Sequence, residues 1–383
     1  MKKIKVDNFF NILFLDILIL SIIELVVRIN YFRPLLHTFK FFNILEFFVA
    51  TIYFLQKSNK KYNIVQILFF IFFFQGIIVG LFNKNSPLSF IIQSYQYIMP
   101  IIMLEYSKNI VNKLQYNNLK IRKKVKILGI VYVICVLIFK CLYMLGMTNY
   151  SAYGSGTIMY ILPYLLFFER DKKISFLVIL AGILSGKRVI LLEVLIICSL
   201  YLILNFKKIK LKYFLIGVPT FVSGFIYLYK CTNVFNRILF TFNNLFSDSK
   251  NYYLATGGRS EEIFLIIKKL NSNFISWFIG KGFGYKVQIA ENLFRGYSHF
   301  SPLGYTMIVG IFFPIILYTI FIYIFWKLFL NKKKICKMFS VYIMEILFAS
   351  LTGGVLFNET KVWFIIGLSY CLYKSRYHLV NIN

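Results

Sequence analysis

The fold is decided by an uncharged apolar run at residues 62–82, YNIVQILFFIFFFQGIIVGLF. A helix rises about 1.5 Å per residue, so a run of this length crosses the roughly 30 Å hydrocarbon core of a bilayer. Similar runs recur along the chain and predict an all-α, polytopic membrane helix bundle of about 12 (10–12) transmembrane helices. We expect them at residues 8–27, 38–55, 62–82, 87–104, 125–145, 157–168, 174–184, 189–206, 213–229, 302–328, 338–355 and 362–373.

The composition of the 383-residue chain excludes a water-soluble fold. Hydrophobic residues make up 59% of it, charged residues only 15%, and the mean hydropathy is +0.71. A net charge of +30 would also fit nucleic-acid binding. The basic residues instead form short clusters between apolar runs, which favours membrane orientation, so we expect the lipid bilayer and no nucleic acid as a partner. The six cysteines show no metal-ligand spacing, and we expect no metal and no cofactor.

The basic clusters also predict the topology. Far more Lys and Arg lie in one alternate set of short loops than in the other, for example at residues 120–124 and 332–334. This set faces the cytoplasm and includes both termini, so we expect a multi-pass protein of the cytoplasmic membrane, built as a single polytopic domain over residues 1–383. Residues 230–301, between predicted spans 9 and 10, form one large extracytoplasmic loop. Within it, residues 260–270 carry the pattern of an amphipathic helix on the membrane surface.

Two residues of this loop are candidates for chemistry. Arg259 lies at an expected helix start, where backbone N–H groups favour an anion and a guanidinium can add a bidentate contact to phosphate. Alternatively, the Arg259 side chain contacts lipid headgroups or pairs with Glu262. His299 precedes Pro302 and a long span, where a neutral imidazole could accept a proton from an attacking sugar hydroxyl. Its alternative is an interfacial histidine bonded to backbone.

Other loop residues are candidates for substrate binding. The Gly280, Gly282 and Gly284 pattern either lets backbone approach a ligand or makes a tight turn. It does not open a helix after a strand, so it does not predict a dinucleotide site. The substrate-binding candidates of the loop are Arg237, Gly282, Gly284, Tyr285 and Arg295.

A second constellation is Ser185-Gly186-Lys187-Arg188, between a short and a long apolar segment. Because eleven helical residues reach only about 16 Å, this break can lie at membrane depth, where Lys187 and Arg188 would face a polar cavity. A helix beginning near Arg188 would favour an anion. The alternative is an ordinary external loop. We expect Lys187 in substrate binding and Arg188 in catalysis.

In their order along the chain, these features resemble those of the superfamily of O-antigen and capsular polysaccharide polymerases (Wzy-type) and O-antigen ligases. The resemblance runs from residue 174 to about 318 and rests on the Ser-Gly-x-Arg break, the large outer loop with Gly-Arg-Ser-Glu, the Gly280–Gly284 pattern and a histidine before a span. It implies metal-independent, inverting glycosyl transfer from an undecaprenyl-diphosphate-linked oligosaccharide to a lipid-linked acceptor on the outer face. Arg188 and Arg259 would hold the donor diphosphate, and His299 would orient or activate the acceptor hydroxyl. Expected partners are a chain-length regulator and a flippase.

Two other functions are carried as alternatives. An O-antigen ligase-like glycosyltransferase would share the loop, but the ligase branch usually has Asn after the loop histidine, where this chain has Phe300. A lipid-linked oligosaccharide flippase would also have about twelve spans with buried charges, yet it would not need so large an outer loop. The polymerase is therefore the expected function.

Overall fold

The computed structural model describes residues 6–30, 37–56, 62–114, 118–148, 152–153, 156–205, 259–290 and 293–374. The chain divides into two compact units. The first comprises Met1–Leu13, Lys40–Asn118 and Thr256–Asn383, and the second comprises Phe14–Phe39 and Leu119–Ala255. Each unit is described by itself below.

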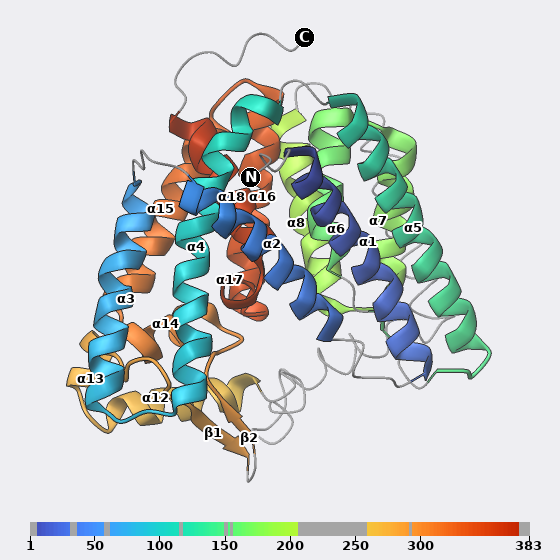
Figure 1. Ribbon diagram of the computed structural model, residues 1–383. Helices are drawn as coiled ribbons and strands as arrows, with labels where there is room; N and C mark the ends of the chain where they lie inside the picture. Colours follow the sequence, from blue (N-terminus) through green and yellow to red (C-terminus); the bar gives the residue numbers. More distant parts are fainter. Residues whose placement is uncertain are drawn as a thin grey trace. The chain divides into compact units, whose positions relative to one another are not determined.

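In the described residues of the first unit, the regular elements are helices and one small hairpin of two antiparallel strands (Figure 1). Helices α12 and α13 and the hairpin lie at the end of the unit where α3 ends and α4 begins (Figure 1). The elements are α2 His37–Gln56, α3 Ile64–Phe82, α4 Pro87–Leu114, α12 Arg259–Asn271, α13 Ile275–Ile279, β1 Val287–Ala290, β2 Leu293–Arg295, α14 Ser301–Val309, α15 Phe312–Phe329, α16 Lys334–Thr352, α17 Val355–Asn358 and α18 Thr360–Lys374.

The second unit contains the greater part of α1 and the described helices from α5 to α8. Its elements are α1 Val6–Asn30, α5 Asn118–Met144, α6 Thr157–Pro163 with a π-helical continuation at Tyr164–Glu169, α7 Lys172–Leu184 and α8 Arg188–Asn205. Ser21 on α1 hydrogen-bonds Thr157 on α6 at 2.8 Å between side-chain oxygens. The Tyr153 hydroxyl donates to the Ser21 carbonyl at 2.5 Å, so buried polar groups join these elements inside the apolar unit.

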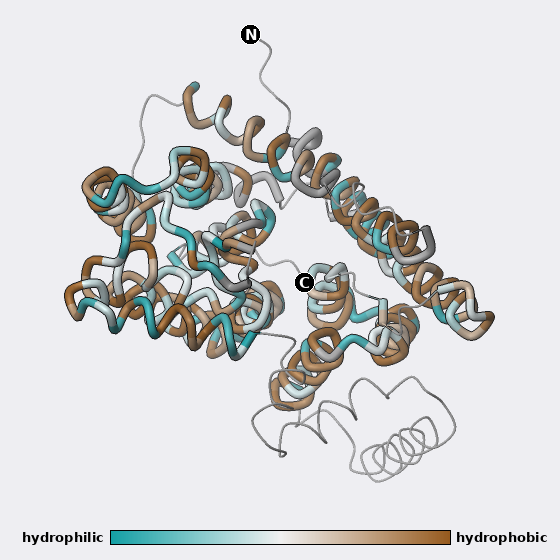
Figure 2. Tube along the Cα trace, turned by 90° about the horizontal axis from the view of Figure 1, so that it is seen from below, coloured by the Kyte–Doolittle hydropathy of each residue, from teal (hydrophilic) through white to brown (hydrophobic). Residues whose placement is uncertain are grey.

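Five helices among the described residues are long and apolar enough to cross a membrane: Ile64–Phe82, Pro87–Lys108, Lys120–Met144, Phe312–Phe329 and Lys334–Thr352. Hydrophobic residues predominate along the helices in both units (Figure 2). Many of these residues are exposed, such as Phe74 and Ile78 on α3, which a soluble protein would bury. These are the properties of a helical membrane protein. The predicted span at residues 213–229 lies outside the described residues.

One predicted span is wrong in the structure. Residues 302–328 were expected to form one helix, but α14 ends at Val309 and α15 begins at Phe312. Gly310 has φ of 89°, a conformation outside the helical region, and the N–H of Ile311 donates to the Trp277 carbonyl at 2.8 Å. The break therefore follows from a hydrogen bond to the backbone of α13. Local hydropathy does not predict this bond, because the two residues are far apart in sequence. The β1–β2 hairpin was also not predicted.

The core of the first unit is aromatic. Phe69 lies at the centre of edge-to-face pairs with Tyr97, Phe313 and Trp363, at ring-centroid distances of 5.7, 5.0 and 5.0 Å. All four side chains are fully buried. Such pairs add about 0.5–1.5 kcal/mol each beyond burial of their area, and they join α3, α4, α15 and α18 into one packed body.

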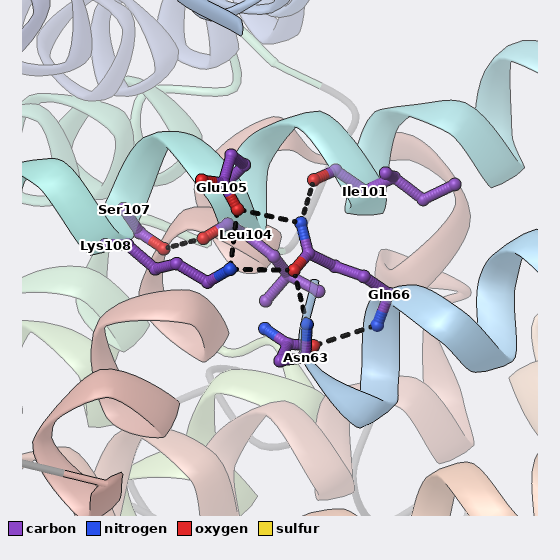
Figure 3. Close-up of polar contacts among 7 residues, drawn as sticks. All are labelled: Asn63, Gln66, Ile101, Leu104, Glu105, Ser107 and Lys108. Atoms are coloured by element: carbon purple, nitrogen blue, oxygen red, sulfur yellow. Dashed lines mark hydrogen bonds and ion pairs between the residues drawn. The ribbon is translucent and has the colours of Figure 1, made fainter. Parts of the chain in front are cut away.

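A polar cluster holds the start of α3 against α4 (Figure 3). Asn63 caps α3 by accepting from the N–H of Gln66, whose side-chain oxygen accepts from the N–H of Asn63, both at 2.9 Å. Lys108 donates to this oxygen at 3.0 Å and to buried Glu105 at 2.6 Å. Gln66 also donates to the Ile101 carbonyl at 2.9 Å. Because the cluster satisfies its groups internally, we assign it to structure.

Candidate functional site

The described part of the loop centres on the Glu262 carboxylate, which is only 1% exposed. Its Oε2 lies 2.6 Å from Nη1 of Arg295 and 2.9 Å from Nδ1 of His299. Its Oε1 accepts from the Ser298 hydroxyl at 2.7 Å and from the backbone N–H of His299 at 2.8 Å. A single buried carboxylate thus gathers two residues that the sequence analysis had chosen separately.

Three elements position these side chains. Glu262 lies in the first turn of α12, Arg295 ends strand β2, and Ser298 and His299 occupy the turn before α14. Strand β2 pairs with β1 so that Arg295 is opposite Val287. The Gln93 amide on α4 donates to the carbonyls of Tyr285 and Gly296 at 3.0 and 2.7 Å, which fixes the two ends of the hairpin.

The backbone of His299 is held from two directions. Its N–H donates to Glu262, and its carbonyl accepts from the N–H of Gly354 at 3.0 Å. Gly354 belongs to the turn between α16 and α17, so a segment distant in sequence packs directly on the histidine. His299 itself is about one quarter exposed, with a side-chain accessibility of 25%.

The electrostatics favour an ionised Glu262. Burial by itself would raise the pKa of this carboxyl, but hydrogen bonds from the His299 ring, the Ser298 hydroxyl and the His299 N–H outweigh burial and lower the pKa to about 2. The carboxylate is therefore charged at neutral pH, beside the Arg295 guanidinium.

The same geometry fixes the His299 tautomer. An ionised carboxylate only accepts, so Nδ1 of the ring carries the proton that it donates to Glu262. Nη1 of Arg295 is 2.9 Å from Nδ1 as well, but a guanidinium only donates, and in this network it donates to the carboxylate. In the neutral form of the ring, Nε2 of His299 is then the unprotonated nitrogen, which can accept a proton.

Gly282 and Gly284, predicted to bind substrate, are buried against α3 and the turn that follows it. A Cβ on Gly282 would overlap the backbone of Gly80, and one on Gly284 would lie 2.8 Å from the Asn85 Cβ. Their φ angles, 79° and 87°, are those that favour glycine. The packing gives both residues a structural role, and their contact with substrate stays a prediction. Tyr285 is half-buried, which raises the pKa of its phenol.

The two predicted diphosphate arginines belong to different units of the chain. Arg259 is the first residue of α12, three residues before Glu262 in the first unit, and is partly buried. Lys187 and Arg188 belong to the second unit, at the break between α7 and α8 where Gly186 has φ of 71°. The Arg188 side chain and the whole of Arg237 lie outside what the structure describes. A shared diphosphate therefore stays a prediction.

The role of Glu262 was not predicted from the sequence, which indicated this residue only as an alternative partner of Arg259. One local signal existed: Glu262 falls in the first turn of an amphipathic helix on the same side as Ile266 and Leu270, which are buried. A carboxylate on a buried helix face requires a partner. Nothing local, however, identifies Arg295 and His299 as that partner.

Among the residues that the structure describes, no group of three or more His, Cys, Asp or Glu side chains is placed to hold a metal ion. Comparison of the chain with protein-family models, with curated proteins and with solved structures finds no match.

Proposed function

We propose that the chain is an oligosaccharide repeat-unit polymerase, a membrane glycosyltransferase acting on undecaprenyl-diphosphate-linked sugars. The observation that supports this function best is the Glu262–His299 pair, in which a buried carboxylate fixes the tautomer of a partly exposed imidazole. A histidine held in this way is suited to general-base catalysis, which contributes about 10²–10⁴-fold to rate. It fits a reaction whose nucleophile is a hydroxyl.

The proposed step is a displacement at the anomeric carbon of the donor. An acceptor hydroxyl oxygen forms the new C–O bond while the bond from the anomeric carbon to the phosphate oxygen breaks, and the electron pair leaves with undecaprenyl diphosphate. The hydroxyl proton passes to Nε2 of His299, and Glu262 stabilises the imidazolium that forms. Inversion of the anomeric centre follows from a single displacement.

Arginines would stabilise the leaving diphosphate. Arg259 at the start of α12 can offer a bidentate contact, and we predict that Arg188, the first residue of α8, and Lys187 before it add positive charge at the diphosphate. Arg295 donates to Glu262, which supports a positioning role for it rather than the substrate contact expected from sequence. Gly282, Gly284 and Tyr285 would border the acceptor.

The proposed placement is the cytoplasmic membrane, with about twelve spans, both termini in the cytoplasm and residues 230–301 outside. It is supported by the apolar helices and by the distribution of Lys and Arg among the loops. Reporter fusions at Lys286 and Lys333 test it, because these exposed residues should map to opposite sides. Signals on the same side would contradict the topology.

The function is tested by complementing a deletion strain with wild type, His299→Ala, Glu262→Gln or Glu261→Gln, and analysing lipid-linked saccharides. Glu261 is the matched control, since it is adjacent but exposed. We expect the first two variants to accumulate single lipid-linked repeats on the outer face, while Glu261→Gln makes normal polymer. Long lipid-linked chains in the deletion strain would indicate a ligase instead. Single repeats confined to the cytoplasmic face would indicate a flippase.

A further inference from the structure

An irregular segment at residues 280–284 runs along α3 instead of projecting away from it. The N–H of Phe283 donates to the Gly76 carbonyl at 2.8 Å, and its ring packs on Phe73 and Tyr97 at centroid distances of 5.7 and 4.9 Å. Phe283 is fully buried. Gly76 and Gly80 leave room for this contact, because a Cβ on Gly76 would lie 2.6 Å from the Phe283 ring.

The beginning of this segment lies well within the length of α3. Gln75 donates through its side-chain amide to the Ile279 carbonyl at 3.1 Å and to the Val309 carbonyl at 2.9 Å. Gln75 is seven residues before Phe82, the last residue of α3, and hence about 10 Å along the helix axis from that end. Phe74 and Ile78, on either side of Gln75, are 59% and 54% exposed. Ile279 therefore lies at a depth where α3 still presents apolar side chains outward.

Every N–H group of the segment has a hydrogen-bond acceptor within the protein. Lys281 and Gly282 donate their N–H groups to the carbonyls of Met307 and Ile308 at 2.8 and 2.9 Å, and Gly284 donates to Gln93 at 2.6 Å. The Asn85 side chain donates to the carbonyls of Lys281 and Phe283 at 2.8 and 2.9 Å. Non-helical backbone is tolerated at membrane depth only when protein groups replace water in this way. A loop in water would not need a protein acceptor for each of its N–H groups.

The outer side of α13 is apolar. Phe274, just before the helix, and Ile275, Phe278 and Ile279 on it are 72%, 59%, 39% and 43% exposed. The Phe278 ring packs on Phe312, the first residue of α15, at 5.8 Å between centroids. This surface is thus continuous with the exposed apolar residues of α15, which like α3 has the length and composition of a membrane span.

We propose that α13 and residues 280–284 form a re-entrant membrane segment, which dips into the outer leaflet and returns along α3. The acyl chains of that leaflet cover Phe274, Ile275, Phe278 and Ile279. The hairpin and α12, with its exposed Lys268 and Lys269, stay at the aqueous side. This inference rests on α3 and α15 crossing the bilayer, and it does not depend on glycosyl transfer.

The unmodified full-length chain tests the proposal in vesicles of phosphatidylethanolamine and phosphatidylglycerol that contain a phosphatidylcholine with a diazirine on its acyl chain. Trypsin digestion of the photolabelled chain yields separate peptides for the three regions to be compared. These are residues 270–281 for α13, 287–295 for the hairpin and 62–84 for α3. We expect photolabelling of 270–281 to approach that of 62–84 and to exceed that of 287–295 at least several-fold. Labelling of 270–281 no greater than that of 287–295 would overturn the proposal. The hairpin is a stringent control because its Phe294 is also 54% exposed.

Depth is measured independently by spin labels on single cysteines in a background without native cysteines. Phe278→Cys and Ile275→Cys should show collision rates with oxygen and with a water-soluble nickel complex that match those of Ile78→Cys on α3. Lys269→Cys and Lys286→Cys, both at exposed positions, report the aqueous side. If Phe278 and Ile275 collide with the nickel complex as often as the two lysine positions do, α13 lies in water, and the apolar surface would then be free to bind another protein.

Discussion

Replacing Glu262 by glutamine should remove the buried negative charge of the candidate site. At neutral pH the buried carboxylate accepts from Arg295, Ser298 and His299. Its pKa falls from 4.5 to about 2 on folding, and at about 1.4 kcal/mol per pKa unit this stabilises the folded chain by at most about 3.5 kcal/mol. Glu262→Gln should lose an amount of that order, because Arg295 keeps its charge without a counter-charge.

The pH dependence follows from the direction of the shift. A carboxyl with a lowered folded-state pKa stabilises the protein fully above pH 4.5, and this contribution disappears as the pH falls towards 2. The stability difference between wild type and Glu262→Gln should thus be largest at pH 7 and shrink through that window. It is measured by equilibrium unfolding in mixed detergent micelles, followed by circular dichroism.

Glu261→Gln serves as the control, since the exposed neighbour should change stability by no more than about 0.5 kcal/mol. The reasoning is refuted if Glu262→Gln is as mild as this control at pH 7. It is also refuted if the difference between wild type and Glu262→Gln stays constant from pH 7 to pH 3.

Three further substitutions test the packing of the loop and of the helices. Gly282→Ala should sharply reduce the yield of monodisperse protein, because its Cβ overlaps the backbone of α3, whereas Gly146→Ala, with a similar φ of 72° and nothing within 4 Å of its Cβ, should be much milder. Phe283→Ala should cost about 3–5 kcal/mol in unfolding free energy, against about 0.5 kcal/mol or less for Phe264→Ala, which is 64% exposed. Gln66→Leu should cost about 1–3 kcal/mol by removing the acceptor of the buried Asn63 N–H and of Lys108, and unfolding no easier than wild type would contradict the structural assignment of that cluster.

Helix positions were largely predictable because local sequence determines them. The uncharged run at 62–82 became Ile64–Phe82, and the amphipathic pattern at 260–270 became Arg259–Asn271. Charged clusters, glycine and proline mark the ends of such segments, and apolar side chains fill them. The break at Gly310 was not predictable in this way, since the carbonyl that accepts from Ile311 belongs to Trp277.

The site was only half predictable for the same reason. Arginine can bind an anion and histidine can transfer a proton in any loop, so residue type alone made Arg295 and His299 candidates for the site. Glu262 became central only because the hairpin returns over α12, and that contact joins residues more than thirty positions apart in sequence. The structural role of Gly282 and Gly284 also depends on residues distant in sequence, because they pack against Gly80 on α3 and Asn85 in the turn after it.

The contact between Gly354 and the carbonyl of His299 ties the imidazole to the helices that follow the loop. Under the proposed function, an acceptor hydroxyl would meet an imidazole that already has its reactive orientation, so little ordering entropy remains to be lost between the bound complex and the transition state. Lengthening the turn between α16 and α17 by one residue would break this hydrogen bond without changing the amino-acid sequence of the loop. Turnover would then fall with acceptor affinity nearly unchanged.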